Sequence, residues 1–407
     1  MKAISVLIPD GEHPLALRVV RSLGFTHRVT VDLLTCERWP SSRFSRFCRH
    51  CHFTTRRITD GDRGHAILDT VTAAPVDVLL PVSVEGIRLV LAEQQALMHH
   101  VAIPPLPDLA TLDMANDKAA LCRFARRCNV PLPPSLLFPD EVSDSGALLH
   151  LAYPILLKPA TLDGGRGFQL FRDSQTLSTF LATNPGVRAA GRYVLQSYLA
   201  GSDFGLNVLC RNGEILAFTV QKNPLSVSPP FGPAAGIHFV TDAEPLEIGT
   251  RLLSALRWNG VANLDMLRCA ATGEMLLLEM NPRYWRTLLG SEYAGVNFPY
   301  LACLAALDRP LPPTDYRTIA YAEKSVALRE ALRMVAGRTL LPGFRLKNTS
   351  MSAALKDPLP GLAYYGTRLL SRCRHLHRGG RGESKASGAP FPCATGTEAA
   401  SPRKRAS

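Results

Sequence analysis

Residues 155–168 read ILLKPATLDGGRGF, and the interpretation of the whole chain depends on this stretch. An apolar run ends in Lys158, three glycines and Arg166 follow, and a second apolar run begins at Phe168. Glycine-rich turns between strands are common, so a plain hairpin explains the stretch on its own. The backbone N–H groups of the glycines could also bind an anion, with Arg166 adding positive charge. Lys158 needs a reason for its position, because buried lysines are rare unless they are paired.

The order of these residues excludes the phosphate-binding P-loop. A P-loop places its glycines before its lysine and leads into a helix, whose N-terminal amides meet the phosphate. Here the lysine comes first, and the glycines lie between two segments that both predict strands. The choice between a hairpin and a lid over phosphates therefore depends on residues elsewhere in the chain.

A second group of polar residues lies about a hundred positions later, in two strand-like segments joined by the turn ATG. If these strands pair in antiparallel fashion, Asp265 and Glu279 face each other, and two facing carboxylates repel strongly without a cation. Asn281 lies two residues after Glu279 and so shares its strand face. Such hard oxygen ligands are the type that Mg²⁺ takes alongside phosphate oxygens. The alternative is a structural ion pair between Glu279 and Arg283.

The remaining pattern predicts a mixed architecture. Alternating strand and helix signals fill residues 1–110, which is typical of a small parallel α/β sheet. Asn116 or Asp117 is suited to cap the helix that follows. Strand signals then dominate residues 153–220, where Asn212-Gly213 predicts a two-residue hairpin turn.

Composition and charge are those of an ordinary globular protein. The chain has 407 residues, 46% hydrophobic and 20% charged, so two or three domains are expected. No window reaches the eighteen or so uninterrupted apolar residues of a membrane span. Ten cysteines without a framework spacing favour a reducing cytoplasm. The net charge of +12 arises mostly after residue 367, where nine Lys or Arg oppose two Glu, so a solvated basic tail explains it without specific nucleic-acid binding.

Several separate motifs together resemble the ATP-grasp superfamily, of the carboxylate–amine or carboxylate–thiol ligase type. The motifs NDKAAL, ILLKPATLDGGRGF, YVLQSYLAGSD and NLDM…LLLEMNPR occur in the family's order, and the likeness covers roughly residues 1–310. In these motifs the chain is similar to D-alanine–D-alanine ligase and to the ATP-grasp domains of carbamoyl-phosphate synthetase. The resemblance implies an α/β and α+β fold with an N-terminal Rossmann-like domain and a two-subdomain ATP-grasp unit. The expected division is 1–110 pre-ATP-grasp domain, 111–199 small lid subdomain, 200–313 large subdomain with the metal site, 314–376 C-terminal extension and 377–407 disordered basic tail.

The resemblance also implies a role for each residue that matches a motif. Two lysines would contact the α- and β-phosphates, the glycine loop would close over the β- and γ-phosphates, and a hinge would hold adenosine. The metal strands would bind Mg²⁺, with Mn²⁺ as a substitute. The expected residues are Lys118 and Lys158 for the phosphates, Gly164, Gly165, Arg166 and Gly167 for the lid, the backbone of Tyr198 and Leu199 with Asp203 for adenosine, and Asp265, Glu279 and Asn281 for the metal.

Two positions need separate comment. Arg283 is expected beside the transferring phosphoryl group or the substrate carboxylate, so Arg283, Lys158 and Arg166 are the expected catalytic residues. The hinge departs from the family at Gln196, where a glutamate often lies near the adenine amino group. A glutamine can still accept a hydrogen bond from that amine, so weaker discrimination between bases is expected, with binding retained.

The implied reaction is ATP-dependent ligation of two small molecules, a carboxylate and an amine. The carboxylate would become an acyl phosphate with release of ADP, and the amine would then displace phosphate. The alternative is a non-catalytic ATP-binding or regulatory protein that keeps the fold. A third class, a nucleic-acid- or membrane-associated protein, would use the basic tail. A homodimer is compatible with the sequence.

Some features stay open at this stage. The segment 223–239 is rich in proline and glycine and predicts a long loop, which in a compact domain is often functional. Lys222 and His238 flank or end this loop, and Trp285 follows the metal motif, so all three are candidates for substrate contact. Cys48 and Cys51 have CxxC spacing, but the second ligand pair that a zinc site usually has is not visible downstream.

Overall fold

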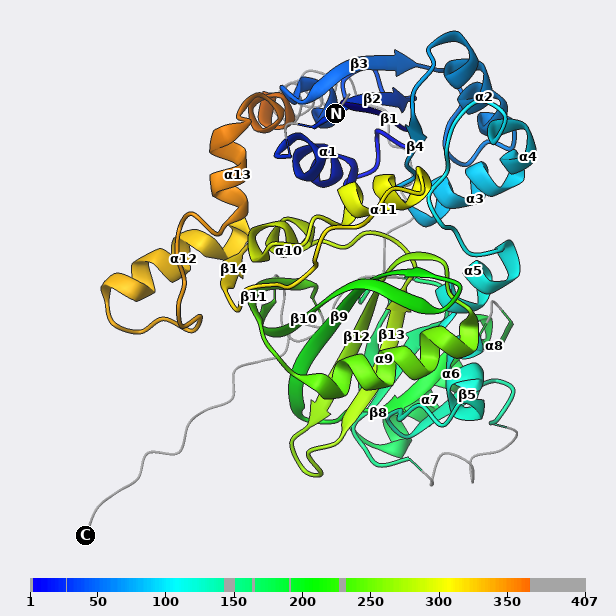
Figure 1. The fold of residues 1–407 in the computed structure, drawn as a ribbon. Helices are drawn as coiled ribbons and strands as arrows, with labels where there is room; N and C mark the ends of the chain where they lie inside the picture. The colour runs from blue at the N-terminus through cyan, green and yellow to red at the C-terminus, as the bar shows by residue number, and fades with distance from the viewer. Residues whose placement is uncertain are drawn as a thin grey trace, which may run out of the picture. The chain divides into compact units, whose positions relative to one another are not determined.

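The computed structural model describes residues 3–26, 28–142, 151–162, 165–189, 192–226 and 232–366 (Figure 1). Gly164 and the predicted disordered segment 377–407 lie outside these residues. Three β-sheets organise the described chain, of four, four and six strands. None of the described helices combines the length and the hydrophobicity needed to cross a bilayer.

The first sheet is parallel throughout, as the strand–helix alternation predicts, with strand order β3-β2-β1-β4. Strands β1 and β2 are almost fully buried, as the apolar strands of a parallel sheet covered by helices usually are. Two short helices, α3 and α4, follow the last strand of this sheet. The elements are β1 Ile4–Ile8, α1 Ala16–Gly24, β2 Val29–Thr35, η1 Ser41–Phe44, β3 Cys48–Phe53, α2 Arg63–Ala73, β4 Val78–Leu79, α3 Val84–Ala92 and α4 Gln94–Leu97.

The second sheet has the order β5-β8-β6-β7, and all of its pairs are antiparallel. Strands β6 and β7 form the hairpin that carries the glycine-rich stretch, with Leu157 opposite Gln169. The sequence therefore places Lys158 at the end of a buried strand, one residue before the loop region. The elements are β5 Ser135–Phe138, β6 Ile155–Pro159, β7 Gln169–Phe171, α7 Ser174–Thr183, α8 Pro185–Ala189 and β8 Tyr193–Ser197.

The third sheet is antiparallel, with the order β13-β12-β9-β10-β11-β14. Strands β9 and β10 meet at the predicted turn, where Asn212 and Gly213 both have positive φ values, 52° and 85°. The elements are β9 Gly201–Arg211, β10 Glu214–Ser226, β11 Ala234–Phe239, α9 Ala243–Leu256, β12 Gly260–Cys269, β13 Met275–Asn281, α10 Leu288–Ala294, α11 Phe298–Ala306 and β14 Ala320–Ala322.

Alternation along the central strands gives this sheet one apolar and one polar face. Leu206 of β9 and Leu264 of β12 pack with Leu252 of helix α9, which lies across the sheet in Figure 1. Helices α5 (Leu109–Asn116) and α6 (Lys118–Arg127) join the same apolar cluster. The intervening residues, such as Asn263 and Asp265, therefore point to the opposite face. This alternation positions the candidate site.

One expectation about the C-terminal half is wrong. The segment 223–239 is not one long loop, because β10 continues to Ser226 and β11 begins at Ala234; residues 227–231 lie outside the described part. The segment after Pro313 contributes strand β14 to the large sheet. It also forms helices α12 (Lys324–Val335) and α13 (Ser350–Lys356).

Candidate active site

The two acidic residues of the predicted metal set face each other across strands β12 and β13. Asp265 is the register partner of Glu279, and Asn263 is the partner of Asn281. The Asn281 amide nitrogen donates to Asp265 Oδ2 at 3.1 Å and to Glu279 Oε1 at 3.4 Å. Burial and the neighbouring Glu279 carboxylate raise the pKa of Asp265 well above its usual value. Two carboxylates held this close favour a proton or a cation between them.

Both predicted lysines approach these carboxylates from other elements. Lys118 begins helix α6, and its Nζ lies 3.2 Å from Glu279 Oε2 while donating to the carbonyl oxygen of Leu162 at 2.6 Å. Lys158 is the penultimate residue of strand β6 and is buried, with Nζ 5.3 Å from the ring centre of Phe168. The structure thus brings cations from the second sheet and its preceding helix against carboxylates of the third sheet.

Lys158 has an unusual environment for a lysine. Burial is the main cause that lowers its pKa from 10.5 to about 8; Glu279 opposes this change, and Lys118 adds to it. Its Nζ donates a short hydrogen bond to the side-chain oxygen of Gln196, which itself donates to Ser135 Oγ at 3.1 Å. Gln196 was expected near the adenine amine, yet its oxygen is engaged by Lys158 in this structure.

A cavity of about 340 Å³ lies between the second and third sheets. Most of the predicted site residues line it, although they are spread over more than a hundred positions of sequence. Lys118 adjoins it behind Lys158, while Arg166 and Gly167 are exposed on the β6–β7 connection and are not part of its described wall. The predicted residues in its wall are Lys158, Gly165, Gln196, Tyr198, Leu199, Asp203, Asp265, Glu279, Asn281 and Arg283.

The hinge between the two sheets forms one end of this cavity. Tyr198 and Leu199 connect β8 to β9, and the Tyr198 amide donates to the carbonyl oxygen of Pro154 at 2.8 Å. Asp203 lies on β9, where burial raises the pKa of its carboxyl and the charge of Lys158 lowers it. The backbone of the hinge is thus fixed to the start of strand β6, the strand that carries Lys158.

A chain of polar side chains runs across the sheet from the predicted metal residues and was missed in the sequence. Asn281, Asn263, Asn207 and Thr219 occupy facing positions on four neighbouring strands. Asn263 Nδ2 donates to Asn207 Oδ1 at 3.0 Å, and Asn207 Nδ2 donates to Thr219 Oγ1 at 3.1 Å and Gln221 Oε1 at 3.2 Å. The sequence signal that could have revealed this chain is the recurrence of polar residues at alternate positions of an otherwise buried strand.

Arg283 lies directly after this chain of amides. Its Nη2 donates to Asn281 Oδ1 at 3.2 Å and its Nη1 donates to the Tyr284 carbonyl oxygen at 3.0 Å. The guanidinium therefore holds the side-chain oxygen of Asn281 while the amide nitrogen of Asn281 faces the two carboxylates. Asn281 is thereby fixed between an arginine and the acidic pair.

Five residues that the sequence left open remain to be placed: Lys222, His238, Trp285, Cys48 and Cys51. Lys222 and His238 are register partners on β10 and β11, and burial followed by the Lys222 charge lowers the pKa of His238. Trp285 lines the cavity and also packs edge-on against Phe298, with ring centres 4.8 Å apart. Cys48 and Cys51 belong to strand β3; among the described residues no group of three or more His, Cys, Asp and Glu could hold a metal ion.

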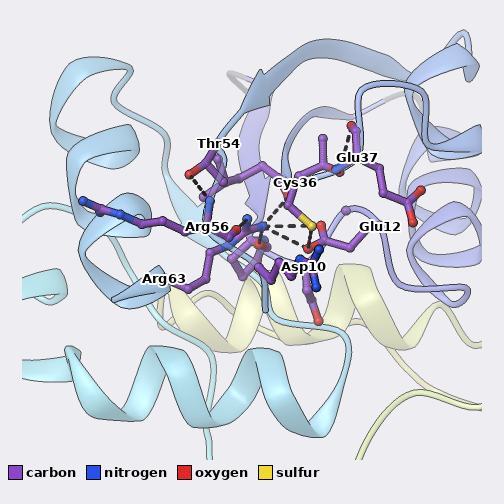
Figure 2. A network of polar contacts seen from close by, with 12 residues as sticks. Asp10, Glu12, Cys36, Glu37, Thr54, Arg56 and Arg63 are labelled. Carbon is purple, nitrogen blue, oxygen red and sulfur yellow. Dashed lines mark hydrogen bonds and ion pairs between the residues drawn. The ribbon is translucent and has the colours of Figure 1, made fainter. Parts of the chain in front are cut away.

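A second polar cluster occupies the carboxyl ends of β1 and β2 (Figure 2). Arg63 is fully buried there and donates to the carbonyl oxygens of Pro9 and Leu34 and to the Glu12 carboxylate, the last at 3.3 Å. Burial raises the pKa of Asp10 to about 6, although its carboxylate accepts hydrogen bonds from Ser83. These contacts connect the strand ends to helices α2 and α3, which gives the cluster a structural role.

Residues 189–330 match the family described as ATP-grasp in the biosynthetic pathway with Ter operon. The carbamoyl phosphate synthase large chain of Thermomicrobium roseum is 26% identical over 218 residues, which are 52% of this chain and 20% of that protein. The arginine-specific large chain of Lactiplantibacillus plantarum is 24% identical over 271 residues, 62% of this chain and 27% of that protein. The match thus spans about a quarter or less of these relatives.

Solved structures match over a larger share of the chain. N5-carboxyaminoimidazole synthetase from Staphylococcus aureus, complexed with ADP, has a TM-score of 0.64 at 14% identity and covers 85% of this chain and 92% of its own. The biotin carboxylase domain of 2-oxoglutarate carboxylase from Hydrogenobacter thermophilus, complexed with MgADP, ADP and bicarbonate, has a TM-score of 0.61 at 16% identity, covering 78% and 73%.

The chain has the ATP-grasp fold. The sequence resemblance is therefore confirmed, as is the expected α/β and α+β fold with a Rossmann-like N-terminal part followed by an ATP-grasp unit. Within this ATP-grasp fold the glycine-rich stretch lies on the second sheet and the acidic pair on the third. The opening stretch, ILLKPATLDGGRGF, is a hairpin by geometry, with Lys158 and Gly165 in the wall of the shared cavity.

Proposed function

We propose that this chain is an ATP-dependent ligase that activates a carboxylate as an acyl phosphate and joins it to an amine. One observation carries the proposal. Lys158 of the second sheet and the Asp265–Glu279 pair of the third sheet line a single cavity, and Lys118 reaches the same pair. Phosphoryl transfer requires positive charges that contact the phosphates. It also requires oxygen ligands that hold a divalent cation.

The acidic pair fits a magnesium ion by its chemistry. Its two carboxylates are partly buried opposite each other. Burial and then the neighbouring Glu279 charge raise the pKa of Asp265, and a divalent cation would offset both. Asn281 already bridges both carboxylates through its amide nitrogen. For the side-chain oxygen of Asn281 to serve as a ligand, the amide would have to turn over and give up its contact with Arg283 Nη2. Asp265, Glu279 and Asn281 would hold Mg²⁺, or Mn²⁺ in its place.

The same arrangement supports binding of ATP along the cavity. The hinge at Tyr198 and Leu199 would take adenine through backbone groups, and Asp203 would accept from the ribose hydroxyls. Lys118 and Lys158 would neutralise the α- and β-phosphates, and Gly164, Gly165, Arg166 and Gly167 would close over the β- and γ-phosphates. Gln196 would act mainly through Lys158, since it holds that ammonium group in place.

The chemistry follows from charge and position. MgATP supplies the phosphoryl group, whose transfer to a carboxylate oxygen breaks the bond to ADP and leaves an acyl phosphate. The amine then attacks the acyl carbon, phosphate leaves, and the nitrogen gives up a proton. Arg283 would orient the carboxylate or the transferring phosphoryl group, because its guanidinium follows the metal strand and borders the cavity. The protein's part is positioning and neutralisation, so the site needs no activated serine or cysteine.

A non-catalytic ATP-binding or regulatory protein is the second candidate. Such a protein needs the hinge and the lysines, but it has no need for two facing, partly buried carboxylates, whose repulsion destabilises the fold. The retention of both Asp265 and Glu279 in this chain therefore favours turnover.

The test is ADP release by the purified full chain with MgATP and pooled carboxylates, with and without pooled amines. Glu279→Ala is expected to lower the rate by at least about 100-fold, because a missing electrostatic stabiliser of a transition state typically has that effect. Glu274→Ala removes an exposed carboxylate beside the same strand and serves as the matched control. Equal rates in the wild type and Glu279→Ala would contradict the metal assignment. Nucleotide binding with no ADP release from any pool would favour the regulatory protein.

A further inference from the structure

The C-terminal extension exposes an unusual amount of apolar surface. Among the described residues, ten of the eighteen exposed large apolar side chains lie between Leu328 and Tyr364. Single exposed leucines are normal on protein surfaces, whereas a concentration of them marks an interaction site. We call this group the C-terminal apolar surface; its members are Leu328, Leu332, Met334, Val335, Leu340, Leu346, Leu355, Leu359, Leu362 and Tyr364.

Helix α12 shows that this exposure follows a pattern. Leu328, Leu332 and Val335 recur at i, i+4 and i+7, so they share one face of the helix, and Val335 is 85% exposed. Val326 and Ala327 lie on the other side, where they pack with residues of β11 and β14. Helix α12 is therefore anchored to the edge of the large sheet by one face (Figure 1) and presents a second apolar face outward.

The charges around this surface all have one sign. Residues 324–364 contain seven Lys or Arg, at positions 324, 329, 333, 338, 345, 347 and 356. The two acidic residues of the same segment, Glu330 and Asp357, are buried and paired with Arg333 and Arg21. The segment thus exposes leucines together with basic side chains and has no exposed carboxylate between Lys324 and Tyr364.

The chain continues from this surface with more positive charge. Residues 367–407 contain nine Lys or Arg and two Glu. A partner of this region must therefore be apolar and anionic at once. A second copy of the chain fits poorly, because a two-fold contact would place the same cations against one another. A nucleic acid would use the basic side chains but would leave the exposed leucines without a role.

We propose that the C-terminal apolar surface docks on a lipid bilayer that contains anionic phospholipids. The leucines and Val335 would enter the boundary between headgroups and acyl chains, and the surrounding lysines and arginines would pair with the lipid phosphates. This is peripheral attachment by a helix face, so it needs no membrane span. The proposal does not depend on the ligase activity, since none of these residues belongs to the cavity wall.

The test is sedimentation of the purified full chain with large unilamellar vesicles of phosphatidylcholine alone or mixed with phosphatidylglycerol. Binding is expected to the mixed vesicles, to weaken as salt increases, and to be weak on phosphatidylcholine alone. The variant Leu328→Glu/Leu332→Glu/Val335→Glu is expected to lose at least about tenfold in partitioning, because three carboxylates replace apolar side chains at the lipid boundary.

The control variant adds two negative charges, where the α12 variant adds three, and places them outside the C-terminal apolar surface. Met98→Glu/Leu109→Glu alters two apolar side chains that are exposed in the N-terminal half, and it should bind like the wild type. If the α12 variant melts below the wild type, Arg329→Glu/Arg338→Glu/Arg345→Glu tests the same surface through its charges. Wild-type binding by both α12-region variants would overturn the proposal. The proposal would also be overturned if the wild type is dimeric without vesicles and substitution of Leu328, Leu332 and Val335 makes the protein monomeric.

Discussion

Lys158 is buried against the side-chain oxygen of Gln196, although most lysines in folded proteins reach water. Burial lowers its pKa to about 8, and a phosphate contact requires the protonated form. Gln196 accepts a hydrogen bond from Nζ but adds no charge, so it positions the ammonium group without restoring its pKa. A glutamate at the same place would do both, since a neighbouring anion favours the charged form of a lysine.

The affinity for MgATP is therefore expected to fall as pH rises through about 8, where Lys158 loses its proton. In Gln196→Glu the midpoint should move up by about one to three pH units. Isothermal titration across neutral and alkaline pH measures this, and Lys158→Met should remove the dependence. Identical midpoints in the wild type and Gln196→Glu would contradict the role given to Gln196.

The pH dependence of folding stability has the opposite sign. Between pH 8 and 10.5 the unfolded chain binds more protons at Lys158 than the folded chain does, so stability rises with pH.

Whether the sequence predicts a contact between two side chains depends on whether the alternation of side chains along a strand determines it. The facing of Asp265 and Glu279 was predictable because strand alternation and one short turn fix which residues oppose each other. The contact between Lys158 and Gln196 was not, because it depends on the rotamers of two long side chains from strands β6 and β8. The row of amides from Asn281 to Gln221 also required the sheet order, which no single segment contains.

Helix α6 delivers Lys118 to the site, and its first turn depends on Asp117. The Asp117 side chain accepts from the backbone N–H groups of Ala119 and Ala120, both at 2.9 Å, and pairs with Arg192 of the second sheet's region. The Lys118 amide donates to the carbonyl oxygen of Ala160 at 2.8 Å. The Asp117 carboxylate therefore fixes the start of the helix, and the neighbouring Lys118 amide holds the residue that follows strand β6.

Asp117→Ala is expected to lower the free energy of unfolding by about 1–2 kcal/mol, as loss of a helix cap typically does. Because Lys118 is the next residue, the variant should also bind MgATP more weakly. Asp117→Asn keeps a capping oxygen but loses the charge that faces Arg192, so it should retain most of the stability. Urea unfolding and nucleotide titration of both variants provide the measurement. Equal stability of Asp117→Ala and the wild type would show that the cap contributes little.

Elements with strong local signals were predictable, and those stabilised by distant contacts were not. The strands around Asn212-Gly213 alternate cleanly and meet at a turn that demands positive φ, so their position was evident. Strand β14 has three residues and exists because it pairs with β11, eighty positions earlier in the chain. Helix α12 has an apolar residue on most of its faces, which hides the period that a sequence pattern would reveal.

The ends of the described chain are joined by a buried ion pair. Arg21 of helix α1 donates from Nε to Asp357 Oδ2 at 3.0 Å, just after helix α13, and Asp357 is 1% exposed. Ser45 Oγ and the amide of Arg46 donate to the same carboxylate, each at 2.9 Å. The N-terminal sheet and the C-terminal extension therefore share one carboxylate as a common acceptor, at a separation of 336 residues.

Loss of this carboxylate should destabilise the whole molecule, because it leaves the largely buried Arg21 and two further donors without their acceptor. Asp357→Ala is expected to lower the free energy of unfolding by about 3–5 kcal/mol in urea denaturation, the range for breaking a buried pair. Asp113→Ala removes one partner of the exposed pair with Arg88 and should change it by less than about 1 kcal/mol. Arg21→Met added to Asp357→Ala should recover part of the loss, since the unpaired charge is then gone. If instead Asp357→Ala unfolds at the same urea concentration as Asp113→Ala, the N-terminal sheet and the C-terminal extension do not depend on this contact for their stability.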